Sequence, residues 1–235
     1  MELKAVFFDA GNTLIYPDPP VGEVYAGALR EAGLSADGDE VQQQFESAWR
    51  RLRREQSSGA LEYGATESEA MGWWRRVVRE SVKPFGAPAD FEEMFLSLWN
   101  HFASTSAWRV YADVFPTFEG LERSGRGIGL ISNWDVRLMP LLGELGLRGR
   151  LRWTVVSCQV GAEKPDRAIF QRALEECAVP AESVLHVGDS YVEDVVGARN
   201  AGLHAVWLRR DRQGVGASDD VEVIGSLVEL LDVVG

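Results

Sequence analysis

The chain opens with a short apolar run that ends in an acidic residue. The run is Ala5–Phe8, and Asp9 follows it directly. An apolar run of this length is typical of a strand that is buried on both faces of a parallel sheet. Ligands of open α/β sheets bind outside the carboxyl ends of the strands. We therefore expect Asp9 to lie at the functional edge of an α/β sheet.

A second apolar run, far along the chain, has the same form. Val184–Val187 is followed by Gly188 and Asp189, and Asp194 comes shortly after them. The carboxyl ends of parallel strands meet at one edge of the sheet. The two strands that end in aspartate therefore predict a shared carboxylate site.

The region between residues 18 and 104 is helical in pattern throughout. Apolar residues recur at helical spacing in four segments, near 21–32, 41–52, 73–82 and 91–102, with no strand pattern between them. Successive amphipathic helices of this kind are typical of a helical bundle. We therefore predict a helical domain at residues 17–104, inserted into a core made of residues 1–16 and 105–235.

Strands alternate with helices in the rest of the chain. The strands are expected at 127–132, 153–157, 184–187 and 205–208, and the helices near 117–123, 138–145, 167–177, 192–201 and 226–231. Alternation of this kind predicts a parallel sheet with helices on both faces. The predicted fold class is therefore α/β, with a doubly wound, Rossmann-like core.

Composition limits the classes of partner. The formal net charge of −12 argues against nucleic acid and against an anionic membrane surface. No apolar run approaches the roughly 20 residues of a membrane-spanning helix. A strand is expected so near Met1 that no signal peptide is predicted, and the two cysteines have no metal-ligand spacing. We expect a cytoplasmic protein, a monomer or a homodimer, that acts on a small molecule.

Four groups of polar residues follow predicted core strands. In chain order they are Asp9, Ser132 with Asn133, Lys164, and the segment 188–194. Mg²⁺ prefers carboxylate oxygens together with water and substrate phosphate. A carboxylate can also attack phosphorus as a nucleophile, and hydroxyl and ammonium groups can bind a phosphoryl group. The residue types therefore agree on phosphoryl-transfer chemistry.

This ordered set resembles the four motifs of the haloacid dehalogenase superfamily. The stretches Ile131–Asp135, Glu163–Phe170 and Val187–Arg199 are close to the motifs of its capped, phosphatase-like branch. In that branch a helical cap is inserted after the first strand, as predicted for residues 17–104. The resemblance covers nearly the whole chain and implies a hydrolase.

The resemblance also implies a magnesium site. Asp9 would be both the nucleophile and a metal ligand, and the backbone carbonyl of Gly11 would be a second ligand. Asp189 and Asp194 would complete the protein's share of the site, directly or through water. The implied cofactor is Mg²⁺.

The resemblance further implies a phosphoryl site. Ser132, Asn133 and Lys164 would bind the phosphoryl group of a small phosphorylated metabolite. Lys164 would also offset the charge of the clustered carboxylates. Asp9, Ser132 and Lys164 would then be the catalytic residues of a phosphatase that forms an aspartyl-phosphate.

Gly11 departs from the usual pattern of these phosphatases. They usually carry a second aspartate two residues after the nucleophile, which protonates the leaving group and later activates water. General acid–base catalysis contributes roughly 10²–10⁴-fold, or about 3–5 kcal/mol. Three interpretations are open: substrates with good leaving groups, such as acyl or aryl phosphates; replacement by water, Asn12 or a cap residue; or chemistry other than phosphate ester hydrolysis.

Other functions are therefore considered. The 2-haloacid dehalogenases also lack the second aspartate and need no metal, but they generally lack the motif seen here as Gly188-Asp189. Phosphonatases use a cap lysine, and the predicted cap contains only Lys83, without a supporting motif. A non-catalytic binding protein is the third alternative, although binding alone does not require Asp9.

Three polar residues near the motifs are interpreted as structural. His186 lies within a predicted buried strand, where a histidine is usually a hydrogen-bonded core residue. Ser190 and Glu193 are expected to cap and solvate the helix that follows Asp189, since such residues favour a first helical turn.

Overall fold

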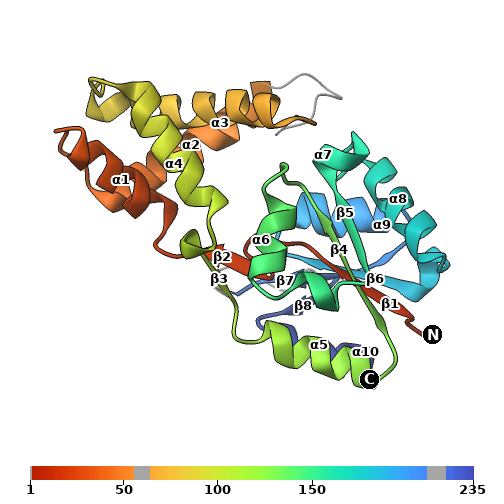
Figure 1. Ribbon diagram of the computed structural model, residues 1–235. Helices are drawn as coiled ribbons and strands as arrows, with labels where there is room; N and C mark the ends of the chain where they lie inside the picture. The colour runs from red at the N-terminus through yellow and green to blue at the C-terminus, as the bar shows by residue number, and fades with distance from the viewer. Residues whose placement is uncertain (1, 56–63, 211–220) are drawn as a thin grey trace. The chain divides into compact units, whose positions relative to one another are not determined.

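The computed structural model describes residues 2–55, 64–210 and 221–235 of the chain (Figure 1). The chain divides into two compact units. The α/β unit comprises Met1–Tyr16, Val110–Trp134 and Leu142–Gly235, and the helical unit comprises Pro17–Arg109 and Asp135–Leu141. The sequence prediction placed the second boundary after residue 104 and did not assign residues 135–141 to the helical unit.

The α/β unit contains a six-stranded parallel sheet (Figure 1). Its strands are β1 (Ala5–Phe8), β4 (Gly127–Ser132), β5 (Trp153–Val156), β6 (Val184–Gly188), β7 (His204–Leu208) and β8 (Glu222–Ile224). Their order is β5-β4-β1-β6-β7-β8, and each neighbouring pair is parallel. Strands are added first on one side of β1 and then on the other. This confirms the predicted doubly wound core, whose binding crevice is expected where the winding reverses, beside β1.

Helices cover both faces of the sheet, because the residues of the central strand β1 are buried on both sides. The longer ones are α5 (Val114–Arg123) and α8 (Arg167–Cys177), and the shorter ones are α7 (Ser157–Val160), α9 (Gly197–Asn200) and α10 (Leu230–Val234). The helix α6 (Leu138–Glu144) begins in the helical unit and ends in the α/β unit. Successive strand side chains point to opposite faces. Phe7 of β1 joins a buried cluster with Phe170 of α8. The Phe8 ring lies 5.4 Å from the ring of Phe118 on α5. All four residues of β1 are therefore apolar, and Asp9 follows where the strand ends.

One predicted helix has a different form. The sequence predicts a continuous helix near 192–201, whereas the structure has a π-helix, η5 (Tyr191–Val196), followed by α9. The π-helical turn is wider than an α-helical turn and is frequent at functional sites. Apolar periodicity over so few residues does not distinguish the two turns, so the sequence pattern could not predict η5.

The described residues of the helical unit form four main helices. They are α1 (Val21–Glu31), α2 (Gly38–Glu55), α3 (Glu67–Val82) and α4 (Phe91–Ala103). Tyr25, Phe95 and Trp99 are among the buried residues of their shared apolar cluster. Thr66 and Asp90 cap the first turns of α3 and α4 by accepting backbone N–H bonds. Two short strands that were not predicted, β2 (Ile15–Pro17) and β3 (Trp108–Val110), pair where the chain passes between the units.

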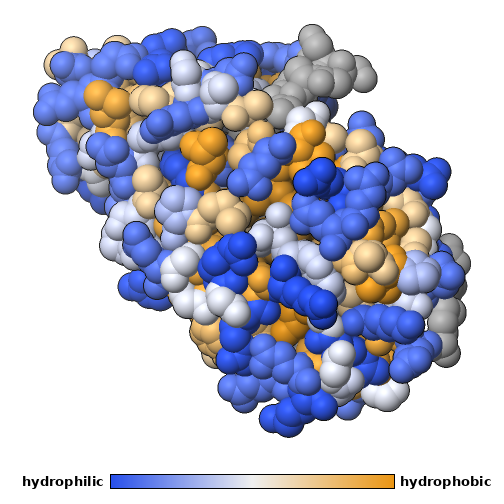
Figure 2. Space-filling model, turned by 45° about the vertical axis from the view of Figure 1, so that its right-hand side comes forward, coloured by the Kyte–Doolittle hydropathy of each residue, from blue (hydrophilic) through white to orange (hydrophobic). Residues whose placement is uncertain are grey.

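One face of the molecule is shown in Figure 2. The face in Figure 2 is mostly hydrophilic, with scattered hydrophobic residues. In the part of the chain that the structure describes, no helix has both the length and the apolar composition needed to cross a membrane.

Candidate active site

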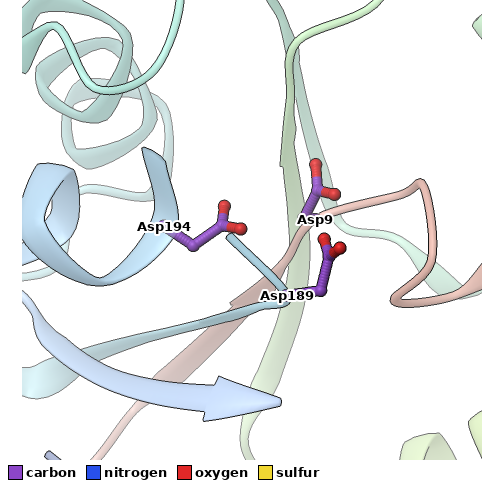
Figure 3. A group of neighbouring side chains, drawn as sticks. All are labelled: Asp9, Asp189 and Asp194. Carbon is purple, nitrogen blue, oxygen red and sulfur yellow. The ribbon is translucent and has the colours of Figure 1, made fainter. Parts of the chain in front are cut away.

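Three aspartates meet at the carboxyl end of the sheet (Figure 3). Asp9 follows β1, Asp189 follows β6, and Asp194 lies on η5. One carboxylate oxygen from each lies within 4.8 Å of the other two. Because β1 and β6 are parallel neighbours in register, the residues that follow them are brought side by side. The predicted shared carboxylate site is therefore formed.

The turn after β6 places Asp194 against the end of the sheet. The Ser190 amide donates to Asp194 Oδ2 over 2.9 Å, and the Asp194 amide donates to the Ser190 carbonyl over 2.8 Å. A Cβ atom at Gly188 would overlap the Asp194 carboxylate. Only glycine at position 188 therefore allows the carboxylate to lie against the strand end.

Lys164 links two of the carboxylates. Its ammonium donates to Asp9 Oδ1 over 2.7 Å and to Asp194 Oδ1 over 2.6 Å, and its side chain is 1% exposed. The Ser132 hydroxyl, at the end of β4, donates to the same Asp9 oxygen over 2.9 Å. The structure thus brings together Asp9, Ser132, Lys164 and Asp194, as the motif order predicts.

The Asn133 side chain holds Lys164 in place. Its Oδ1 accepts the Lys164 amide over 2.7 Å, and its Nδ2 donates to the Lys164 carbonyl over 2.9 Å. Nδ2 also donates to Glu193 Oε2 over 3.3 Å. The sequence interpretation gave Asn133 a substrate-binding role, but both ends of this amide are already occupied by the protein. Its side chain is therefore placed to position Lys164.

His186 is a buried, hydrogen-bonded residue, as the sequence interpretation expected, but its partner belongs to the site, and Glu193 also contacts the site through Asn133; these two contacts were not predicted. His186 Nε2 lies 2.9 Å from Asp194 Oδ1, and the histidine is fully buried. Burial lowers the pKa of His186, although Asp194 opposes that shift. A neutral His186 with its proton on Nε2 therefore donates to Asp194. The available signal was spacing, because residues 186 and 188 share one face of β6.

Burial raises the pKa of all three carboxylates, but their charged neighbours make the net shifts differ. Burial raises the pKa of Asp189 to about 7, and the charges of Asp9 and Asp194 add to the shift. Burial also raises the pKa of Asp9, against the opposing effect of Lys164. Burial acts in the same direction on Asp194, but Lys164 and His186 hold the pKa of Asp194 well below its usual range. Burial disfavours the Lys164 ammonium, yet Asp194 and Asp9 raise the pKa of that group overall.

These residues fit a hard divalent cation. Asp9, Asp189 and Asp194 offer only oxygen ligands, which Mg²⁺ prefers. Lys164 donates to Asp9 and Asp194 among them, and the charges of Asp9 and Asp194 still add to the effect of burial in raising the pKa of Asp189. A bound cation would supply the missing positive charge. Asp9 and Asp189 are the carboxylates best placed to hold it, because both oxygens of Asp194 already accept hydrogen bonds, Oδ1 from Lys164 and His186 and Oδ2 from the Ser190 amide.

Gly11 lies in a tight loop beside an aromatic ring. A Cβ atom at Gly11 would lie 3.3 Å from Cζ3 of Trp134. Gly11 forms an isolated bridge with Ile15, and Asn12 adopts a left-handed conformation with φ of 53°. A side chain at position 11 would therefore have to share its space with Trp134.

Comparison with known proteins agrees with this geometry. The sequence matches the family model for haloacid dehalogenase-like hydrolases over residues 3–202. Haloacid dehalogenase-like hydrolase domain-containing protein 3 of Danio rerio is 33% identical over 211 residues, which cover 88% of this chain and 86% of that protein. Glyceraldehyde 3-phosphate phosphatase of Methanopyrus kandleri is 30% identical over 242 residues, which cover 99% of this chain and 97% of that protein.

The fold is also found among proteins with a different activity. The solved structure of an L-2-haloacid dehalogenase superposes with a TM-score of 0.78 at 20% identity, covering 100% of this chain and 99% of that chain. At this identity the likeness concerns the fold alone. The choice between phosphorus and carbon chemistry therefore rests on the site residues.

Proposed function

The chain belongs to the haloacid dehalogenase-like hydrolases, and we propose that it is a Mg²⁺-dependent phosphatase that acts on a small phosphorylated metabolite through an aspartyl-phosphate on Asp9. One observation carries this proposal: Asp9, Asp189 and Asp194 hold carboxylate oxygens within 4.8 Å of one another. Displacement of halide from carbon does not require such a cation site. The phosphatase named among the relatives supports the same choice.

Each residue of the site has a role in this reaction. An Asp9 carboxylate oxygen attacks phosphorus, and the bond from phosphorus to the leaving-group oxygen breaks. The Ser132 hydroxyl and the Lys164 ammonium, which both donate to Asp9 Oδ1, are placed to bind phosphoryl oxygens beside the attacking atom. Water then hydrolyses the aspartyl-phosphate, which releases inorganic phosphate and restores Asp9.

A bound Mg²⁺ would neutralise charge on the phosphoryl oxygens and on the carboxylates that hold it. Asp9 and Asp189, with the Gly11 carbonyl, are the proposed ligands, and Asp194 completes the site directly or through water. Lys164 and His186 keep the Asp194 carboxyl ionised. Mg²⁺ would therefore not have to displace a proton from Asp194 at neutral pH.

Gly11 points to the class of leaving group. Position 11 carries no acid, and the Trp134 ring borders the space that a side chain there would use. We therefore expect acyl or aryl phosphates, whose leaving groups need little protonation, to react faster than alkyl phosphates.

An activity screen tests the proposal. Acetyl phosphate, p-nitrophenyl phosphate, glycerol phosphate and 2-chloropropionate are each assayed with Mg²⁺ and with EDTA. We expect phosphate release from the first two, dependent on Mg²⁺ and abolished by Asp9→Asn. Asp232→Asn, an exposed carboxylate of α10, is the matched control and should keep full activity.

The alternatives give different outcomes in the same screen. Metal-independent chloride release would support a 2-haloacid dehalogenase and contradict the phosphatase. Absence of turnover with all four compounds would support a non-catalytic binding protein.

A further inference from the structure

Arg210, two residues after the end of β7, donates to the loop that follows Asp9. Its Nε atom donates to the carbonyl oxygen of Asn12 over 3.2 Å, and its Nη2 atom donates to the carbonyl oxygen of Thr13 over 2.8 Å. These carbonyls directly follow Gly11 in the chain. The guanidinium thus holds two successive peptide groups next to the candidate site.

Asp113 holds the guanidinium from its other side. Arg210 Nη1 and Nη2 donate to the two Asp113 oxygens over 2.9 and 3.1 Å. The Ser226 hydroxyl and the Leu227 amide also donate to Asp113, over 2.7 and 2.8 Å. Burial acts against ionisation of Asp113, but these bonds hold the pKa of its carboxyl below the usual value. Arg210 therefore faces a carboxylate that stays charged.

An aromatic ring supports the same guanidinium. Arg210 Cζ lies 3.5 Å from the centroid of the Tyr111 ring, within the range of a cation–π contact. The Arg210 side chain is only 20% exposed. Its position is therefore set by Asp113 and by Tyr111, whose amide also donates to the Leu14 carbonyl of the same loop over 3.0 Å.

The loop at residues 10–15 is a tight turn closed by backbone hydrogen bonds. The amides of Leu14 and Ile15 both donate to the Ala10 carbonyl, over 2.9 and 3.0 Å, and the Asn12 amide donates to Ile15 over 2.7 Å. Asn12 is in the left-handed region, which few residues other than glycine and asparagine adopt. The orientation of the Gly11 carbonyl depends on this turn.

We propose that Arg210 is a positioning residue for the metal site. By binding the carbonyls of Asn12 and Thr13, it sets the direction of the Gly11 carbonyl relative to the Asp9 carboxylate. The inference rests on the proposed function, in which Gly11 and Asp9 hold the same Mg²⁺. Arg210 acts through the loop and touches neither substrate nor metal.

Arginine suits this task because its donors form a planar fork. Nε and Nη2 address two carbonyls while Nη1 and Nη2 address one carboxylate. A lysine at position 210 has one nitrogen and cannot make all four contacts in these directions. Arg210→Lys should therefore keep part of the Mg²⁺ affinity that Arg210→Gln loses.

The test compares Arg210→Gln, Arg210→Lys and Asp113→Asn in the full chain. Mg²⁺ affinity is measured by isothermal titration calorimetry, and amide hydrogen exchange is measured without metal. We expect Arg210→Gln to weaken Mg²⁺ binding about tenfold or more, in the range of supporting residues at metal sites. We also expect faster exchange at Asn12, Leu14 and Ile15, with the amides of β4 unchanged. Arg210→Lys should lie between the wild type and Arg210→Gln, and Asp113→Asn should act in the same direction.

Arg150→Gln is the matched control. Arg150 donates to Glu122 over 2.9 Å in the same unit, so its loss removes an arginine–carboxylate pair away from the loop. It should keep the wild-type Mg²⁺ affinity. Wild-type affinity in Arg210→Gln, equal losses in Arg150→Gln, or faster exchange throughout the sheet would each overturn the proposal. If Arg210→Gln does not fold, Arg210→Lys and Asp113→Asn carry the same comparison.

Failure of the proposed function would be seen separately. A wild-type protein that binds Mg²⁺ but hydrolyses no phosphorylated substrate would contradict the proposed phosphatase activity. In that case a loss of Mg²⁺ affinity in Arg210→Gln would still support the positioning role. A wild-type protein that binds no Mg²⁺ would overturn both.

Discussion

Lys164 and Asp9, which lie far apart in the sequence, form a buried ion pair with 2.7 Å between Nζ and Oδ1. Asn133 holds the Lys164 backbone on both sides, so the ammonium approaches Asp9 from a fixed direction. The pair combines the proposed nucleophile with the cation that would bind the transferred group.

Replacing Lys164 should abolish most of the activity. We expect Lys164→Met to lower kcat by about 10²–10³-fold, the range for loss of one donor to developing charge. Lys164→Arg should not restore it, because the planar guanidinium does not fit a site that is 1% exposed. The measurement is kcat with p-nitrophenyl phosphate and Mg²⁺. Lys4→Met, at an exposed lysine, is the control, and wild-type kcat in Lys164→Arg would contradict this account.

Asp189→Asn should stabilise the metal-free protein in a pH-dependent way. The pKa of Asp189 is raised from 3.8 to about 7 by burial and by its acidic neighbours. The folded state therefore binds the proton more tightly than the unfolded state, and this group's contribution to stability falls as pH rises from about 4 to about 7. Asp189→Asn removes that loss of stability. The free energy of unfolding of the variant should therefore exceed that of the wild type by little near pH 4, by more as pH rises towards about 7, and by a constant amount above that pH.

Thermal unfolding in EDTA measures the Asp189 effect. About 1 kcal/mol corresponds to a Tm change of about 2–4 °C in a domain of this size. Saturating Mg²⁺ should reverse the order, because a ligand that binds only the folded state stabilises the wild type more. An advantage that does not change between about pH 4 and 7 would contradict the raised pKa.

Gly11→Asp should broaden the substrate range. An acid at position 11 would protonate poor leaving groups, so kcat/KM with glycerol phosphate should rise by more than that with acetyl phosphate. Gly11→Ala is the matched control, since its Cβ atom meets Trp134 at the same 3.3 Å but adds no acid. Equal effects on the two substrates would show that another group already protonates the leaving group.

Gly188→Ala should damage the site through packing. The added methyl group would overlap the Asp194 carboxylate, so Asp194 must move. We expect destabilisation of about 1–3 kcal/mol, typical of overpacking, together with weaker Mg²⁺ binding. Gly143→Ala, where a Cβ atom meets nothing within 4 Å, is the control and should not lower stability. Chemical denaturation and calorimetry measure both effects, and unchanged Mg²⁺ affinity in Gly188→Ala would contradict this account.

Much of the α/β architecture could be predicted because it depends on local patterns of apolar and polar residues. β4 and α8 have the predicted bounds, residues 127–132 and 167–177. The apolar residues of the strand β4 are buried on both faces of the sheet, and those of the helix α8 are buried on one face. The parallel direction of the strands followed from their alternation with helices, since parallel strands need crossovers, whereas the order of the strands came only from the structure.

The supporting contacts of the site could not be predicted from local patterns. The Asn133 amide lies between Lys164 and Glu193, and Arg210 reaches Asn12 and Thr13. Each contact joins residues far apart in the chain. Polar side chains such as these fit many local environments, so only the packed structure selects their partners.

The sequence by itself determined the sheet, the helical insertion and the positions of Asp9, Ser132, Lys164, Asp189 and Asp194 after core strands. These features depend on periodicity and on where each apolar run ends. Only the tertiary structure decided how the charges are shared, because burial and distances of a few ångströms set the energies of carboxylates and lysine. It placed Lys164 between Asp9 and Asp194, left Asp189 with a raised pKa, and set Trp134 beside the glycine at position 11.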